Sequence, residues 1–593
     1  MVIHIYIYIL DQVMQLAAII IKAHFNNHAE KKSKSLLADV LKEGFVRVLI
    51  IVCALLGLPG VGKTHLKLLL LEKPPPHLRS STICAESPVR IEIRTISGTR
   101  VKTVEGKWQE VDDEDMLDVV ANMIVSQEDE LSSDSAVDDM QSSHKKPKQG
   151  VLNRIFNWIK KGGKTLAGWT SISTDATPPR QAISDGCRKA MKKIMDSLVQ
   201  RITRLRDEKE LVAQPPSRQK NIITTKWIYL TDSGGQPQYH ELLPLFVRHI
   251  SIALCVLRLP DKLDELQSVE YYCEGKRVGP SHLSQLTAKD TIRCLVNTIQ
   301  SYSPLDRPPK ILLVGTHIDK LEDENLEQPL PSKASGSECN ISKSIAEKDK
   351  CLLELLEPEF SDQLVFYSSD MKKLLFPLNT LNPGKREKTN AQSIRQAIEN
   401  SGAREVKVPI WWYILELLLQ ELAKELGRGV LSRAECLQIA YLLDIREDSF
   451  NAALNFFNEL NVIKYSPEVL PNVVFIDSQV PLDKISELVR HSYWLHQSAG
   501  EEPSPVDGEW KRFRDQGVVT SECLKNFDRH YIPGIFSVDD LSELLKHLLV
   551  FAPIPTPSWV PTDKTTPTTT TKYFVMPGKV LLILRPSHIS MHC

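Results

Sequence analysis

The chain has 593 residues, of which 42% are hydrophobic and 25% are charged, which argues against a disordered or fibrous protein and suffices for about three to five domains. The 73 basic and 74 acidic residues leave a net charge of -1, so no overall field draws the chain to nucleic acid or anionic lipid. The 11 cysteines are scattered, without a CxxC pair or a Cys/His cluster at zinc-ligand spacing. This argues against a disulfide framework and a structural metal, and it favours a reducing, cytoplasmic compartment.

Residues 1–44 form an N-terminal extension that begins with an apolar run from Val2 to Ile21. Asp11 and Gln12 interrupt this run, and a carboxylate at the centre of a bilayer costs roughly 2.5–3.5 kcal/mol. No basic segment precedes the run, and no convincing small-residue cleavage site follows it. We therefore expect neither a signal peptide nor a membrane anchor, and a membrane-associated form is the less favoured alternative.

A strand, a glycine-rich loop and a helix are predicted in succession from residue 46. Val46 to Leu56 is apolar apart from Arg47, typical of a parallel strand that is covered on both faces. The loop Gly57 to Thr64 and the helix-forming sequence HLKLLLLEK follow, in the order that a phosphate-binding loop requires. Further strands are expected at Val89 to Ile96, Trp227 to Leu230, Ile252 to Leu257, Lys310 to Val314 and Leu374 to Leu378. Residues 45–400 are thus predicted to form an α/β domain with a doubly wound sheet.

Residues 112–221 interrupt this domain. Their sequence is first acidic and serine-rich, as in SQEDELSSDSAVDDMQ, and then basic with helical character. We expect an insertion whose first half is disordered and whose second half is helical. Within it, Leu152, Ile155, Phe156 and Ile159 share one helical face beside basic residues. That stripe is expected to pack on its own domain, and binding to a membrane surface is the less favoured alternative.

Two mainly helical modules are expected at residues 401–498 and 499–593. Amphipathic helices span Trp411 to Leu426, Arg433 to Leu443 and Asp448 to Leu460, and a short strand and another helix follow. A similar order recurs in Thr520 to Ile554, so both modules are predicted to be winged-helix-like, the second one truncated at its C-terminus. Because EDSFNAALNFFNEL is acidic, we expect these modules to contact protein rather than nucleic acid.

The sequence Gly57-x4-Gly62-Lys63-Thr64 matches the phosphate-binding loop at every constrained position. Glycines let backbone N–H groups wrap phosphate oxygens, Lys63 neutralises the charge of the β- and γ-phosphates, and the Thr64 hydroxyl coordinates Mg²⁺. A tight turn without a ligand is the less favoured alternative. The residues predicted to bind nucleotide here are Gly57, Gly60, Val61, Gly62, Lys63, Thr64 and His65.

Two more polar clusters follow predicted strands. Asp232 would hold Mg²⁺ through water, and Gly235 would bring its N–H to the γ-phosphate. Gln236 stands where it can orient the attacking water. In ILLVGTHIDK, Thr316 and Asp319 follow another buried strand, and a carboxylate there can accept both the N1–H and the exocyclic amine of guanine. Adenine lacks that pair of donors, so the pattern favours GTP over ATP.

The loop, DSGGQ and THID, each at the end of a strand, together resemble the guanine-nucleotide motifs of Ras-like GTPases. The THxD form resembles the Roc domain of the Roco family, and the sequence from VKVPIWWYILELLLQEL to DKISELV resembles the COR region that follows Roc. The resemblance covers about residues 45–555. It implies a Ras-like G domain, GTP or GDP and Mg²⁺ as cofactors, a base pocket of Thr316, His317 and Asp319, a COR-like module at 401–498, and a homodimer.

Two parts of such a site are less well marked. The resemblance places Thr82 in switch I, where its hydroxyl would coordinate Mg²⁺, and a solvated loop threonine is the alternative. The final guanine loop is expected at Asn379-Thr380 or at Ser368-Ser369.

The sequence therefore predicts a cytoplasmic guanine-nucleotide switch that hydrolyses GTP slowly to GDP and phosphate, with Gln236 and Lys63 as catalytic residues. Protein effectors would bind the COR-like and winged-helix-like modules. One alternative is a non-hydrolysing scaffold that bound nucleotide stabilises, and turnover with Gln236 intact and substituted would separate it. Another is a P-loop signalling ATPase with winged-helix domains, which would prefer ATP and tolerate substitution of Asp319.

Overall fold

The computed structural model describes the chain between residues 44 and 575, with gaps. The N-terminal run 2–21, the stripe at 152–159, Thr82 and Gln236 lie outside the described residues. The described ranges are 44–75, 85–95, 106–134, 184–211, 225–235, 242–243, 247–266, 269–273, 276–281, 287–304, 306–321, 336–368, 372–381, 384–443, 445–493, 513, 516–521, 523–524, 535–548, 550–554 and 573–575.

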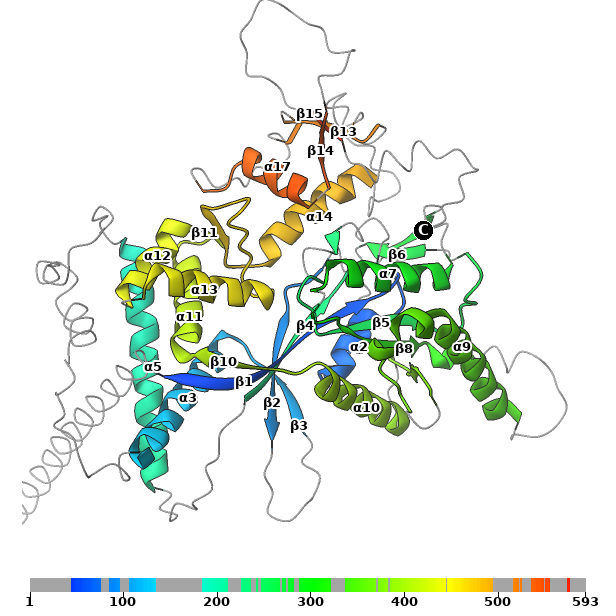
Figure 1. Cartoon of the computed structure of the whole chain (residues 1–593), viewed down its shortest axis with the longest axis horizontal. Coiled ribbons are helices and arrows are strands. Elements are labelled where there is room, and N and C mark those ends of the chain that lie inside the picture. The colour runs from blue at the N-terminus through cyan, green and yellow to red at the C-terminus, as the bar shows by residue number, and fades with distance from the viewer. Residues whose placement is uncertain are drawn as a thin grey trace, which may run out of the picture.

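A mostly parallel sheet forms the centre of the molecule (Figure 1). Its strand order is β3-β2-β4-β1-β5-β8-β9, in which β4, β1, β5, β8 and β9 run parallel to their neighbours in that series. The predicted α/β class with a parallel central sheet is confirmed, and each expected strand is present. The bounds are β1 (Phe45–Leu56), β2 (Val89–Thr95), β3 (Gly106–Glu110), β4 (Thr225–Asp232), β5 (Ile252–Arg258), β8 (Lys310–Thr316) and β9 (Leu375–Pro377).

From Val48 to Leu56 strand β1 is buried on both faces, with only Leu49 half-buried, which explains the unbroken apolar sequence of that part, whereas Phe45 and Arg47 are exposed. Because successive side chains point to opposite faces of a strand, Val52 and Ala54 join one apolar cluster, whereas Cys53 and Leu55 join another. Helices α3 (Asp113–Asp134), α5 (Asp185–Leu211) and α11 (Ile410–Glu425) contribute to the first cluster. Helices α2 (Lys63–Leu70) and α10 (Lys385–Ser401) contribute to the second.

The expected disorder in the first half of the insertion is wrong for residues 113–134, which form helix α3. Met116, Val120 and Ile124 recur every four residues, and all three side chains are fully buried. Figure 1 shows α5 running beside α3 and α11, and each of these helices contacts the other two. The apolar stripe, rather than the acidic composition, therefore decides the structure of this segment. Helix α5 confirms the helical character that was predicted for the second half of the insertion.

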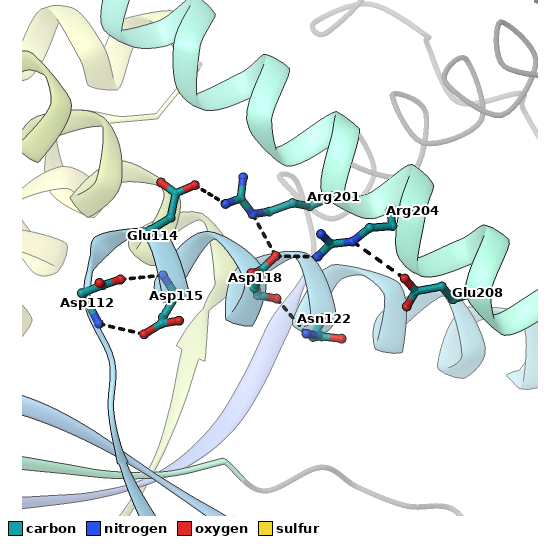
Figure 2. Close-up of polar contacts among 8 residues, drawn as sticks. All are labelled: Asp112, Glu114, Asp115, Asp118, Asn122, Arg201, Arg204 and Glu208. Carbon is teal, nitrogen blue, oxygen red and sulfur yellow. Dashed lines mark hydrogen bonds and ion pairs between the residues drawn. The ribbon is translucent and has the colours of Figure 1, made fainter. Parts of the chain in front are cut away.

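The acidic residues of α3 pair with basic residues of α5 (Figure 2). Asp118 Oδ1 accepts hydrogen bonds from Arg201 Nε at 2.8 Å and from Arg204 at 3.0 Å. Asp112 caps the start of α3, because its carboxylate accepts the Asp115 N–H at 2.8 Å. These contacts compensate charges that, in the sequence alone, suggested an unstructured segment.

Two further helices pack beside strands β5 and β8. Helices α7 (Ala288–Tyr302) and α9 (Gly336–Phe360) share an apolar cluster with these strands. A capping box at Thr287 and Asp290 starts α7. Strands β6 (Val269–Cys273) and β7 (Lys276–Ser281) form a separate antiparallel pair.

The helices and the strand that were predicted after residue 401 are confirmed as elements. Trp411 and Trp412, at the start of α11, pack against the first apolar cluster, and the Trp412 and Phe456 rings lie 5.0 Å apart. Strands β11 and β12 pair antiparallel. After α11 the order is β11 (Val430–Ser432), α12 (Arg433–Leu442), α13 (Glu447–Glu459), β12 (Val473–Phe475), α14 (Gln479–Tyr493), β13 (Val518–Thr520), α17 (Val538–His547), β14 (Ala552–Ile554) and β15 (Tyr573–Val575).

The central sheet extends beyond residue 400. Strand β10 (Arg404–Pro409) pairs antiparallel with the first half of β1, and α11 follows it directly. The predicted division into domains at 44, 400 and 498 and the winged-helix assignment stay predictions. In the part of the chain that the structure describes, no helix has both the length and the apolar character needed to cross a bilayer.

Candidate functional site

The loop between β1 and α2 depends on glycines with backbone angles that other residues avoid. Gly57, Gly60 and Gly62 have φ angles of 145°, 72° and 89°, in the region that glycine adopts without steric cost. At Gly57 a Cβ atom would lie only 2.3 Å from the carbonyl oxygen of Val256 on β5. The sequence pattern thus produces a tightly folded backbone loop at the carboxyl end of β1, next to β5.

Helix α2 begins directly after this loop and carries no side-chain cap. Gly62 occupies its N-cap position, and its first turn contains no acidic residue. The N-terminus of a helix presents backbone N–H groups and a partial positive charge, which suit an anionic ligand. Within the loop, Val61 is buried, and His65 is half-buried in the first turn of α2.

Lys63 lies inside the loop rather than in solvent. Its Nζ donates to the carbonyl oxygens of Gly57 at 2.9 Å and Leu58 at 2.8 Å. Burial lowers the pKa of Lys63 to about 8, and the nearby Asp232 carboxylate opposes that change. The loop therefore holds a cation at its centre, where a phosphate group needs one.

Asp232 ends β4 and faces the start of α2. The hydroxyl of Thr64 donates to Asp232 Oδ2 at 2.5 Å, and the side chain of Asp232 is fully buried. Burial raises the pKa of Asp232, whereas the charge of Lys63 and the hydrogen bond from Thr64 both lower it. A hydroxyl and a carboxylate at this position fit Mg²⁺, because that ion prefers oxygen ligands and binds through few carboxylates.

The segment after Asp232 is joined to the glycine-rich loop. Ser233 Oγ donates to the carbonyl oxygen of Leu55 at 2.6 Å. A Cβ atom at Gly235 would lie 2.3 Å from the nitrogen of Pro59 and 2.6 Å from the oxygen of Leu58. Gly235 thus lies against the backbone of the loop. Ser233 was not among the residues predicted for the site, although its position between Asp232 and two glycines marks it as part of the same turn.

The carboxyl end of β8 approaches the loop from the other side. Thr316 is fully buried, and its hydroxyl donates to the carbonyl oxygen of Val61 at 2.6 Å. The same hydroxyl lies 3.0 Å from Nδ1 of His317, which has a φ angle of 58°. Asp319 is half-exposed, and no hydrogen bond or ion pair joins its carboxylate to another described residue. Its two oxygens are therefore available to a ligand.

Of the two positions expected for the final guanine loop, Asn379-Thr380 lies at the site. Thr380 is buried, and its Oγ1 lies 3.4 Å from the point that a Cβ atom of Gly62 would occupy. Asn379 caps its own turn by accepting the Leu381 N–H at 3.0 Å. Ser368 instead exchanges backbone hydrogen bonds with Lys373, and Ser369 lies outside the described residues.

Residues close to Thr82 and Gln236 in the chain belong to the site. Thr82 and Gln236 are outside the described ranges. The chain that follows Thr82 is described again from Ala85, which forms a β-bridge with Ser233. The Glu86 N–H then donates to the backbone oxygen of Asp232 at 2.9 Å. The site therefore gathers the loop, the end of β4, the end of β8 and Thr380, and the roles of their side chains stay predictions.

Comparisons with known proteins add a likeness to solved structures. No protein-family model and no curated protein matches this sequence. Among solved structures, the chain is similar to Methanosarcina barkeri Roco2 RocCORdC bound to GDP, with a TM-score of 0.39 and 11% sequence identity. The match covers 90% of this chain and 97% of that chain. At this TM-score and identity, the likeness assigns neither a fold family nor a ligand to the present chain.

Proposed function

We propose that the chain binds GTP and GDP with Mg²⁺ at the glycine-rich loop and acts as a molecular switch that hydrolyses GTP slowly. The observation that supports this is the gathering of Lys63, Thr64 and Asp232 with Thr316 and Asp319 at one edge of the sheet. Ligands bind at the carboxyl ends of parallel strands, next to the point where the strand order reverses. Strand β1 occupies that point, because β4 and β5 flank it.

In this proposal the protein positions the phosphates and stabilises their charge. The N–H groups of the loop and of α2 surround the β-phosphate, and Lys63 donates to the β- and γ-phosphates. The Thr64 hydroxyl would hold Mg²⁺ directly and the Asp232 carboxylate would hold it through water, and the bound ion would neutralise phosphate charge. Gly235 donates its N–H to the γ-phosphate, and Gln236 orients the attacking water. Hydrolysis is slow unless a partner supplies an arginine that stabilises the charge of the transition state.

The base is recognised at the other end of the site. Thr316 fixes the end of β8 to the loop through its hydrogen bond to Val61, so the turn that carries His317 and Asp319 keeps a constant distance from the phosphates. Asp319 accepts the N1–H and the exocyclic amine of guanine with its two oxygens. Thr380 lies beside the same turn and closes the pocket.

The part of the chain after residue 401 is proposed to transmit the nucleotide state to protein effectors. The order α11, β11, α12, α13, β12, with β11 paired to β12, supports a winged-helix-like, COR-like module. The acidic residues Glu447 and Asp448 begin α13, which favours a protein partner over a phosphate backbone. The module shares an apolar cluster with β1, so it is in direct contact with the sheet that bears the site.

The test of guanine recognition is Asp319→Asn. Asparagine has an NH₂ donor in place of one carboxylate oxygen, so one of the two guanine donors loses its acceptor, and we expect the Kd for GDP to rise at least about 100-fold. That estimate corresponds to about 3 kcal/mol, from charged hydrogen bonds worth about 1.5–3 kcal/mol each. Xanthosine diphosphate, which has a carbonyl in place of the exocyclic amine, is expected to bind the variant more tightly than the wild type.

Titration calorimetry with each nucleotide measures both changes. Asp306→Asn is the matched control, since Asp306 is an exposed aspartate on the loop before β8 that pairs with Arg307. Unchanged GDP affinity in Asp319→Asn would contradict the assignment of Asp319, and tight ATP binding that ignores the substitution would favour the signalling ATPase.

A further inference from the structure

A glutamine far away in the sequence holds the segment that leads into the candidate site. Gln479 begins α14, and its Oε1 accepts the Ser87 N–H at 2.7 Å. Its Nε2 donates to the backbone oxygen of Ala85 at 3.1 Å. The hydroxyls of Ser478 and Ser87 lie 3.0 Å apart. One side chain of the module at residues 401–498 thus forms hydrogen bonds with backbone groups on both sides of residue 86, as a neighbouring strand would.

The held segment is in direct contact with the metal-binding end of the candidate site. The Glu86 N–H donates to the backbone oxygen of Asp232, and Ala85 is bridged to Ser233. The carboxylate of Glu86 pairs with Lys67 on α2, a helix that begins in the glycine-rich loop. Any displacement of residues 85–87 therefore changes the contacts of Asp232 and of α2 together.

The start of β2 is anchored immediately beyond this segment. Arg90 forms an ion pair with Glu416 of α11, and the two side chains are 9% and 1% exposed. The Arg90 guanidinium also lies over the rings of Trp227 and Tyr229, at 5.9 Å and 5.6 Å from their centroids. Residues 85–87 thus directly precede a fixed point at Arg90, and the Gln479 contact attaches them a second time to the part of the chain after residue 401.

The contact is polar and lies beside open space. Gln479 is itself oriented by Asp483, whose Oδ1 accepts from Nε2 at 2.7 Å. A cavity of about 620 Å³ is lined by Ser87 and Ser478, among other residues. Separating the two segments here would break the hydrogen bonds of Gln479, and it would also expose Ala85, which is buried in the first apolar cluster.

We propose that Gln479 is a positioning residue for the candidate nucleotide site, a role that rests on the proposed function. By fixing Ala85 and Ser87, it holds Glu86 against Asp232 and keeps the metal-binding end of the site in its binding arrangement. Coupling between two sites is reciprocal. A nucleotide that requires this arrangement therefore strengthens the contact between the sheet and α14, and loss of that nucleotide weakens it.

The experiment compares the full-length wild type with Gln479→Ala and Gln479→Glu. In Gln479→Ala we expect GDP to dissociate about fivefold faster or more, measured with a fluorescent GDP analogue in Mg²⁺. Backbone amides at 85–87 and 232–233 are expected to exchange hydrogen faster, as measured by mass spectrometry. Gln479→Glu keeps an acceptor for the Ser87 N–H but sets a carboxylate against Asp483 and the Ala85 oxygen, so it should also release GDP faster than the wild type.

The matched control is Asn472→Ala, which truncates an exposed amide in the same module. It should leave both the dissociation rate and the exchange at 85–87 unchanged. If the wild type binds nucleotide and Gln479→Ala releases it at the wild-type rate, the positioning role is wrong while the proposed function stands. If the wild type binds no guanine nucleotide, the proposed function is wrong. Faster hydrogen exchange at 85–87 in Gln479→Ala would then show only that Gln479 holds this segment in place.

Discussion

Replacing Lys63 with alanine is expected to raise the Kd for GDP by about 100-fold or more. Lys63 is the buried cation inside the loop, and its Nζ donates to the carbonyl oxygens of Gly57 and Leu58. In the bound state it would neutralise phosphate charge in a site with little solvent. Losing a buried charged partner costs about 3–5 kcal/mol, which exceeds the 2.8 kcal/mol of a hundredfold change. Titration calorimetry with GDP in the presence of Mg²⁺ measures the effect.

Lys73→Ala is the control for this substitution. Lys73 follows α2 and is half-exposed, and it pairs with Glu110 rather than with the loop. GDP affinity should therefore stay at the wild-type value in Lys73→Ala. Circular dichroism of Lys63→Ala checks that the variant is folded. Unchanged GDP affinity in a folded Lys63→Ala protein would show that the glycine-rich loop is not the phosphate site.

Replacing Glu416 with alanine is expected to lower the free energy of unfolding by about 3–5 kcal/mol. Glu416 on α11 is 1% exposed and pairs with Arg90 on β2. Its removal leaves the Arg90 guanidinium buried without its carboxylate, facing only the aromatic rings of Trp227 and Tyr229. Burial raises the pKa of Glu416, and the charge of Arg90 opposes that rise, so the two charges depend on each other. Urea unfolding followed by circular dichroism measures the loss.

An exposed ion pair between the same two parts of the chain gives the comparison. Arg47 on β1 and Glu405 on β10 are 3.7 Å apart, and their side chains are 60% and 57% exposed. Glu405→Ala should change the free energy of unfolding by no more than about 0.5 kcal/mol. If Glu416→Ala cost less than about 1 kcal/mol, the Arg90–Glu416 pair would not be the anchor between β2 and α11 that we describe.

The features that could be predicted from sequence are those encoded within a few residues. The apolar run of β1 and the glycines after it specify a strand and a loop by local pattern alone. Asp232 and Thr316 each follow a buried strand, and parallel strands bring their carboxyl ends to one edge of a sheet. The resulting proximity of the loop to both residues needed no knowledge of distant contacts.

The features that could not be predicted depend on residues far apart in the chain. The acidic sequence of α3 suggested disorder, because the residues that compensate its charge, Arg201 and Arg204, lie more than 80 residues away. Strand β10 reaches β1 from beyond residue 400. Gln479 and Ser87 are separated by 392 positions, and a single glutamine at the start of an amphipathic helix has no pattern that marks its partner. Such contacts follow from packing, which periodicity does not encode.

The central claim is that the loop binds guanine nucleotide, and calorimetry on the full-length chain tests it most directly. GDP, a non-hydrolysable GTP analogue and ATP are each titrated into the wild-type protein in the presence of Mg²⁺. We expect the two guanine nucleotides to bind and ATP to give no measurable heat at the same concentrations. Binding of ATP as tight as that of GDP, or binding of none of the three, would contradict the account.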